Sequence, residues 1–184
     1  PRPPAIRVAS ALTLVGLAAS AGAQVKPYAE VVPSTATTQR GVFDAHRVGA
    51  KLYFEIPDSL LGRDMIVMSR YAQVQDSHSQ VGANMAPNLS VRWERRGDQV
   101  HLRAVSHQTT ADSGTARSIA VRAQNFAPVI QAFPVAARGT STSVVDVNEL
   151  YLGEHPAFTL PRQQRTQYAV RRYERDRSWL EFAR

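Results

Sequence analysis

The chain has 184 residues, a formal net charge of +7 and no cysteine. The absence of cysteine excludes disulfides, thiol catalysis and cysteine-ligated metal sites from this segment. Acidic side chains are interleaved with the arginines that supply most of the positive charge, and no lysine-rich stripe or aromatic stacking motif occurs, which argues against a nucleic-acid-binding surface.

The first 23 residues predict a secretory signal peptide. A short positively charged start precedes an uncharged apolar stretch, residues 8–19, and Ala21 and Ala23 fit the small-x-small pattern that signal peptidase requires. Cleavage is expected before Gln24. The apolar stretch is shorter than the ~20 residues that span a bilayer. We therefore expect export to the periplasm or beyond, and no transmembrane segment in the mature chain, whose net charge is +5 because residues 1–23 carry two arginines and no acid.

Residues 24–40 are rich in proline, serine and threonine, which predicts a linker or extended arm. A β-rich domain is expected over residues 41–184. It begins with two predicted strands, residues 42–47 and 51–56, joined by a turn at Gly49-Ala50. After Pro57, Asp58 or Ser59 is expected to cap one helical turn.

The middle of the chain carries its clearest periodicity. Residues 64–71 contain a continuous apolar run, which predicts a central strand buried on both faces. Leu89, Val91 and Trp93 then alternate with polar residues, Gly97-Asp98 predicts a turn, and a matching alternation follows over residues 100–105. Trp93 shares the apolar phase of this hairpin and is expected in the core.

The second half predicts further short elements: a helix at 116–125, a strand at 129–137, a strand at 141–147, a helical turn at 148–152 and a strand at 167–173. Pro134 lacks an N–H and favours an edge or a bulge. Residues 178–184 alternate like a strand just beginning, so we expect the domain to be truncated at its C-terminal end. The predicted fold is mainly β, an antiparallel sandwich or open barrel of short strands with one or two short helices.

No catalytic, cofactor-binding or metal site is predicted in this segment. His-Glu-x-x-His does not occur, and His101 and His107 would lie ~20 Å apart on one strand, too far to share an ion. Residues 139–143 lack the second glycine of a serine nucleophile elbow and favour a hairpin entry. Three carboxylates close in sequence are explained equally well by cap and loop roles: Glu55, Asp58 and Asp64.

Several stretches are specific enough to carry a family resemblance. They include Gly41-Val42-Phe43, residues 51–65 (KLYFEIPDSLLGRDM), residues 91–97 (VRWERRG) and residues 125–130 (NFAPVI). These resemble the N-terminal domains of unknown function of bacterial secreted zinc-dependent metalloproteases, over nearly the whole mature chain. The resemblance implies a downstream peptidase domain with an extended His-Glu-x-x-His-x-x-Gly-x-x-His zinc site and a peptide substrate. No such motif lies in this chain, so zinc is expected only in that domain.

Three functions remain open from the sequence, one of which is an inhibitory pro-segment that would act sterically because no cysteine is present for a cysteine switch. Of the other two, the first is a non-catalytic N-terminal portion of an exported zinc-dependent metalloprotease, which packs on or supports the downstream peptidase domain. The alternative is an exported β-rich binding module for an anionic envelope ligand, attracted by the +5 charge. A cluster of arginines near the C-terminus fits either a docking surface for acidic groups or a solvated strand face: Arg171, Arg172, Arg175 and Arg177.

Overall fold

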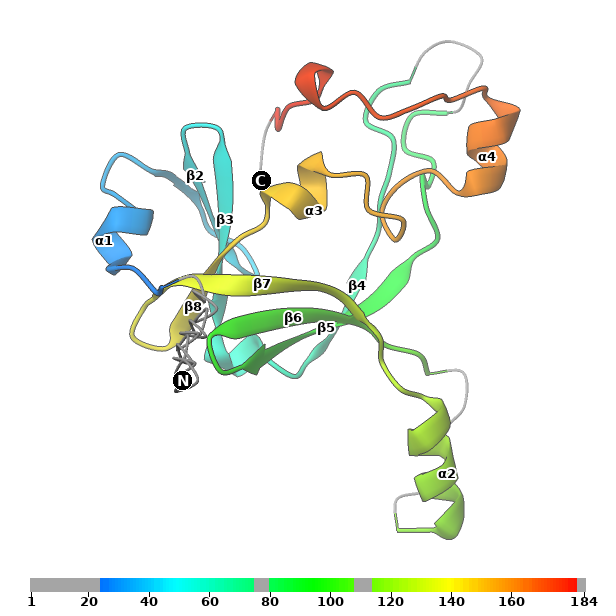
Figure 1. Ribbon diagram of the computed structural model, residues 1–184, viewed down its shortest axis with the longest axis horizontal. Helices are drawn as coiled ribbons and strands as arrows, with labels where there is room; N and C mark the ends of the chain where they lie inside the picture. The colour runs from blue at the N-terminus through cyan, green and yellow to red at the C-terminus, as the bar shows by residue number, and fades with distance from the viewer. Residues whose placement is uncertain (1–23, 75–79, 108–113, 182–184) are drawn as a thin grey trace, which may run out of the picture.

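The computed structural model describes residues 24–74, 80–107 and 114–181. Ala21 and Ala23 of the expected cleavage site lie outside these ranges, and Gln24 is the first described residue. Within the described residues, one sheet of eight antiparallel strands has the order β1-β2-β3-β8-β7-β6-β5-β4 and curls into a half-barrel (Figure 1). The mainly β prediction is confirmed in its open-barrel form.

The strands are β1 (Thr37–Gln39), β2 (Asp44–Val48), β3 (Lys51–Pro57), β4 (Asp64–Val67), β5 (Leu89–Arg96), β6 (Gln99–Ala104), β7 (Val129–Arg138) and β8 (Thr142–Asp146). The helices are α1 (Tyr28–Val31), α2 (Ala116–Gln124), α3 (Asn148–Leu152) and α4 (Arg162–Gln167), with 3-10 turns η1 (Asp58–Leu60) and η2 (Arg175–Arg177). The hairpin β5–β6, the helix α2 and the helical turn α3 fall where the sequence predicts them.

Strand β7 is where the sheet bends. Its first half, Val129 to Pro134, pairs with β6, and its second half, Val135 to Arg138, pairs with β8. The register shifts just after Val135, and such bulges increase twist and bend a strand. Pro134 stands opposite Gln99, where β6 begins. The predicted bulge is therefore confirmed, but β7 is an interior strand and the edge alternative was wrong.

The main core fills the inside of the half-barrel. Trp93 is 4% exposed, as its phase predicted. Its ring lies 5.4 Å from the ring of Phe133, 5.8 Å from that of Phe43 and 6.5 Å from that of Phe54. Aliphatic residues from both halves of the sheet complete the cluster: Leu52, Ile56, Val91, Val100, Leu102, Val135, Val145, Val147 and Leu150. Closing the curl thus buries one continuous apolar face.

A smaller apolar cluster lies on the outer face of the sheet, over strands β3, β8 and the second half of β7. Val31 of α1 packs there with Tyr53, Ala137 and Val144. The N–H of Lys26 donates to the carbonyl of Ala136 at 2.8 Å, which ties the segment before α1 to β7. Residues 24–40, expected as a linker or extended arm, thus carry α1 and the edge strand β1 and belong to the folded unit.

The prediction that residues 64–71 form a central strand was wrong. Strand β4 ends at Val67 and lies at the edge of the sheet. Met65 and Val67 pack against the main core, whereas Ile66 and Met68 face solvent. An uninterrupted apolar run has the same sequence pattern whether one or both faces of its strand are buried. The pattern therefore could not distinguish an edge strand from a central one.

One expected helix cap and two expected strands were also wrong. Neither Asp58 nor Ser59 caps η1, whose N-cap is Pro57 without a side-chain hydrogen bond, and Asp58 instead binds Arg95. The expected strand at 167–173 is replaced by α4 and an irregular segment. Residues 178–181 likewise form no strand.

The end of α4 explains why the chain turns there. The N–H of Val170 donates to the carbonyl of Arg165, and the N–H of Ala169 donates to that of Thr166. These two bonds form a Schellman motif, whose residue after the C-cap adopts a left-handed conformation. That residue is Ala169, with φ 50°, where glycine is usual. Helix α4 therefore ends at a strained alanine.

Replacing Ala169 by glycine is expected to stabilise the protein. Glycine adopts the left-handed conformation without the Cβ clash that costs an L-residue about 1–2 kcal/mol, but it also gains freedom in the unfolded chain. The net gain in the free energy of unfolding is expected to be ~0.5–1 kcal/mol. Urea denaturation measures it, and Ala123→Gly in α2, which should destabilise, is the control.

Candidate functional site

The most buried ionisable side chain of the described residues is an imidazole on the outer face. His46 of β2 is 3% exposed. Its Nε2 lies 2.8 Å from Oε2 of Glu55, and its Nδ1 lies 2.8 Å from Oγ1 of Thr38. Glu55 also accepts hydrogen bonds of 2.6 Å from the hydroxyls of Tyr28 and Thr142. This His46–Glu55 cluster joins α1, β1, β2, β3 and β8.

The cluster keeps its carboxylate ionised. Burial alone raises the pKa of Glu55. The hydrogen bonds from Thr142, Tyr28 and His46 together lower it by more than burial raises it, so the pKa lies below its ordinary value. In return, burial and the bond to Glu55 raise the pKa of Tyr28 to about 12. The tyrosine therefore remains a protonated donor at neutral pH.

The order hydroxyl, imidazole and carboxylate in Thr38, His46 and Glu55 has the connectivity of a nucleophilic triad. Two observations argue for a structural role. The imidazole is almost wholly covered, so a substrate atom cannot approach it, and three donors already engage the carboxylate. The cluster instead anchors residues 24–40 to the sheet.

The other two carboxylates singled out in the sequence do not join Glu55. Asp58 lies 2.7 Å from Arg95, and Asp64 lies 2.6 Å from Arg92. The hydrogen bond and charge of Arg92 hold the pKa of Asp64 below its ordinary value. A two-carboxylate hydrolytic site is therefore not assembled from these residues.

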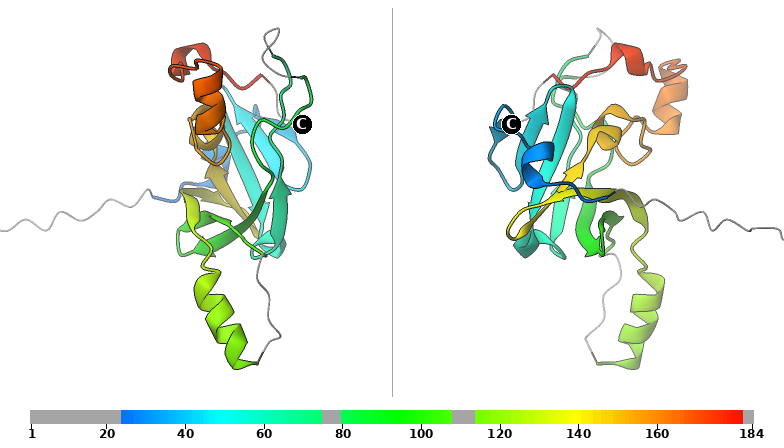
Figure 2. Two further views of the ribbon diagram at one scale, coloured as in Figure 1. Left: turned by 90° about the vertical axis from the view of Figure 1, so that its right-hand side faces the viewer. Right: turned by 60° about the vertical axis from the view of Figure 1, so that its left-hand side comes forward.

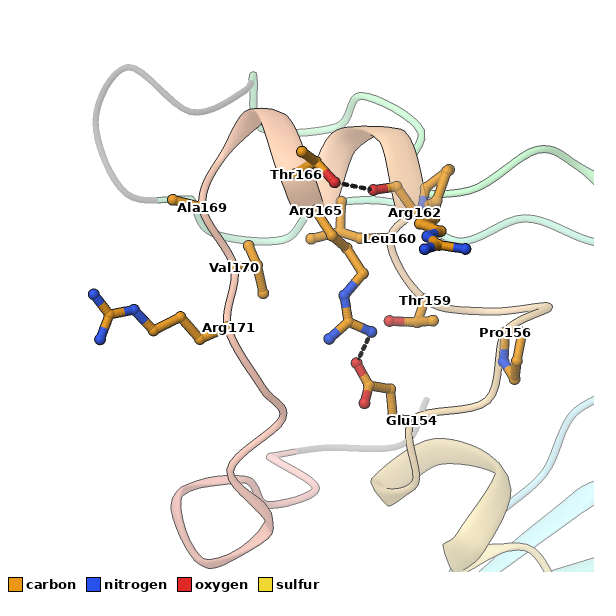
Figure 3. Close-up of a pocket in the computed structure, with 11 residues that line it drawn as sticks. Glu154, Pro156, Thr159, Leu160, Arg162, Arg165, Thr166, Ala169, Val170 and Arg171 are labelled. Atoms are coloured by element: carbon orange, nitrogen blue, oxygen red, sulfur yellow. Dashed lines mark hydrogen bonds and ion pairs between the residues drawn. The ribbon is translucent and has the colours of Figure 1, made fainter.

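Two arginines of the C-terminal cluster make similar local pairs. Arg172 binds Glu174, and Arg175 forms a two-pronged contact with Glu149, at 2.6 and 3.0 Å. Arg165 of α4 reaches across a pocket of about 770 Å³ to pair with Glu154, while Arg171 extends away from it (Figure 3). The guanidinium of Arg165 is thus neutralised by Glu154, while Arg162 and Arg171 supply the other positive charges that line this pocket.

A second cavity, which we call the mouth cavity, lies at the open side of the half-barrel. Its volume is about 440 Å³. Phe43 and Phe54 line it from the core side, and Tyr151 and Leu180 come from the second half of the chain. Gln39, Arg40 and Arg47 provide its polar groups. Cavities of this size and lining, at the mouths of β-barrels, commonly hold small ligands.

The described histidines do not gather. Beyond the His46–Glu55 cluster, His107 lies 3.0 Å from Asp64, His155 bonds the carbonyl of Ile130, and His101 bonds Gln99. His78 lies outside the described ranges. Over residues 24–74, 80–107 and 114–181, no three metal-ligating side chains lie close enough to hold an ion.

The sequence did not single out His46, Gln39 or the two arginines of the mouth cavity. A weak indication for His46 existed, because a histidine alternates with apolar side chains in a predicted strand. Nothing in the sequence indicated the mouth cavity, because the residues that line it, such as Gln39 and Leu180, are far apart along the chain.

The architecture is an open antiparallel half-barrel with a cavity at its mouth. None of the helices in the described part has the length and apolar content to span a bilayer. The chain belongs to the family described as Domain of unknown function (DUF5117), whose model matches residues 82–184. A second model, Domain of unknown function (DUF5118), matches residues 25–74. No curated protein and no solved structure matches the chain.

The two family segments form one structural unit. The first supplies β1 to β4 and the second supplies β5 to β8. In the sheet, β3 pairs with β8 and β4 pairs with β5, so the first segment flanks the second on both sides. Their side chains share the main core, which includes Ile56 from the first and Trp93 from the second. Neither segment can bury its apolar face without the other.

Proposed function

We propose that this chain is the non-catalytic N-terminal portion of an exported bacterial zinc-dependent metalloprotease and packs on a downstream peptidase domain. Zinc and peptide cleavage belong to that domain. The proposal combines the sequence resemblance with one observation, a projecting arm with exposed apolar side chains. No step of the peptidase reaction is assigned to residues of this chain.

The arm consists of α2 and the segment that follows it. Helix α2 projects away from the sheet in every view (Figures 1 and 2). Ile119 is 66% exposed and Phe126 is 73% exposed, and Val129 at the start of β7 is exposed as well. Large exposed apolar side chains that lie close along the chain, as these do, fit a surface that binds another protein or domain.

The base of the arm is held in place. Arg103 of β6 donates to the carbonyl of Ala127 at 2.7 Å, and its guanidinium lies 5.8 Å from the ring centre of Phe126. Nε of Arg103 also lies 2.9 Å from Glu94, although its N–H is not aligned for a hydrogen bond, so this contact is an ion pair only. A fixed base lets the arm present its apolar side chains in one orientation.

The arm is tested in the protein extended through the natural reading frame beyond residue 184. Ile119→Asp combined with Phe126→Asp is expected to lower the melting temperature and peptidase activity of the extended protein, because charges enter a buried interface. The same pair should change the melting temperature of residues 24–184 only slightly, since both side chains are exposed there and the only contact described above that is lost is that of Phe126 with Arg103. Val81→Asp, at another exposed apolar position, is the matched control.

Two results would contradict the proposal. One is a reading frame that carries no extended zinc motif. The other is an arm variant as stable and active as the parent in the extended protein. Salt-sensitive binding of residues 24–184 to dextran sulfate, together with a silent arm variant, would instead support the anionic-ligand module.

A further inference from the structure

The mouth cavity has an apolar floor built by strand alternation. Phe43 precedes β2, and Ala45 and Arg47 follow it at two-residue spacing, so all three point into the curl beside Leu52 and Phe54 of β3. The rings of Phe43 and Phe54 lie 5.6 Å apart and back onto the core. An apolar side chain that enters the cavity therefore meets a rigid aromatic surface.

Two guanidinium groups stand at the cavity. Within the described residues, neither Arg40 nor Arg47 forms an ion pair with a carboxylate, unlike Arg92, Arg95 and Arg175. Both arginines are exposed, so they can turn toward a ligand. Guanidinium pairs bind carboxylates strongly because they offer several N–H donors in a fixed plane. The cavity thus combines an apolar floor with a site for one anionic group.

A third polar group, the side-chain amide of Gln39, restricts which ligands fit the mouth cavity. Oε1 of Gln39 is buried and has no hydrogen-bond donor in the described part of the chain. Gln39 pairs with Ala45 across β1 and β2, which places its side chain on the same face as the aromatic floor. A buried acceptor without a donor is costly, so a rotation of the Gln39 side chain that brings Oε1 to a ligand N–H in the cavity would be favourable.

The protein already shows how this cavity contacts a peptide. The side chain of Leu180 lines it, and Nη1 of Arg47 donates to the main-chain carbonyl of Glu181 at 3.3 Å. An extended segment of the chain itself therefore lies along one wall, with a leucine inward and a main-chain oxygen on a guanidinium.

We propose that the mouth cavity binds the free carboxyl end of a peptide whose last side chain is apolar. The terminal carboxylate lies between Arg40 and Arg47, the last amide N–H donates to Gln39, and the side chain rests on Phe43 and Phe54. A fatty acid would satisfy the arginines and the floor but offers no N–H to Gln39. The site is independent of the proposed peptidase and of the α2 arm.

Calorimetric titration of residues 24–184 with N-acetyl-Ala-Ala-Phe as the free acid tests the site. Saturable binding is expected, and the same peptide as its C-terminal amide should bind at least ~10-fold more weakly, because it has no carboxylate. Arg40→Gln and Arg47→Gln should each weaken binding of the acid by ~10-fold, and Gln39→Leu by several-fold. Arg63→Gln, which removes an exposed charge elsewhere, should leave affinity unchanged.

The competing outcomes are distinct. Absence of binding, or equal binding of acid and amide, overturns the proposal. Binding of decanoate that is tighter than that of the peptide and insensitive to Gln39→Leu overturns it in favour of a lipid site. Thermal melts of every variant establish that folding is intact, since all three polar residues lie outside the packed core.

Discussion

Replacing Trp93 by alanine is expected to lower the free energy of unfolding by about 3–5 kcal/mol, as for other large aromatic residues removed from a core. The indole is almost fully buried and contacts Phe43, Phe54 and Phe133. Those rings come from both halves of the curled sheet. Alanine would leave a cavity in the core where the two halves pack against each other, so the loss is global and not confined to β5.

Equilibrium denaturation in urea measures this loss, and the other tryptophan provides its control. Trp179 is 73% exposed, and Trp179→Ala removes the same side chain without opening a cavity in the core. Its denaturation midpoint should match that of the parent. A Trp93→Ala protein with the parental midpoint would contradict the arrangement of the core described above.

The same residue illustrates what the sequence could reveal. Leu89, Val91 and Trp93 lie on one face of a hairpin closed by a two-residue turn, so the information is local and the period of two decides the face. The pairings β3–β8 and β4–β5 are different, because they join strands separated by long stretches of chain. No local pattern encodes which distant strand becomes the neighbour.

Helix α4 shows a second limit. Residues 167–173 include Tyr168, Val170 and Tyr173, whose β propensity favoured a strand. Propensity is a weak preference, and here Pro161 starts a helix that continues to Gln167 before the left-handed Ala169 ends it. The competing signal, a short run of polar helix-forming residues, has no apolar periodicity and so was missed.

The candidate sites were the least predictable part. The mouth cavity brings Gln39 and Arg47 together with Leu180, and the His46–Glu55 cluster brings Tyr28 to Thr142. Each depends on the curl of the sheet, which the sequence indicates only as a fold class. Which side chains converge at the mouth cavity and at the His46–Glu55 cluster could not be read from the sequence.

Replacing Glu55 by glutamine is expected to lower the free energy of unfolding by about 3 kcal/mol at neutral pH, since it removes one partner of a buried charged network. The side chain of Glu55 is only 15% exposed. His46 would lose its carboxylate partner. The NH2 group of the glutamine would also face the hydroxyls of Tyr28 or Thr142, which now donate to the carboxylate, so two donors would oppose each other. Residues 24–40 should be the first part to detach, because Tyr28 is anchored through this carboxylate.

The loss of stability in Glu55→Gln is expected to depend on pH, and the lowered pKa of Glu55 sets the direction of that dependence. Because the pKa of Glu55 in the folded protein lies below its ordinary value of 4.5, the carboxylate stabilises the fold above pH 4.5, and this contribution is lost as the pH falls through the folded pKa. The stability difference between the parent and Glu55→Gln should therefore be largest near neutrality and shrink in acid. Carboxylates present in both proteins cancel from that difference.

Denaturant melts at a series of pH values from 3 to 7 measure this difference, and Glu149→Gln supplies the comparison. Glu149 is also paired with an arginine, Arg175, but both side chains are more than half exposed, so solvent screens the pair and its removal should change the midpoint little. A Glu55→Gln protein whose deficit is the same at every pH would mean that the hydrogen-bonding geometry, and not the ionised carboxylate, holds β1, β2 and α1 together. A variant without any deficit would show that the cluster does not anchor them at all.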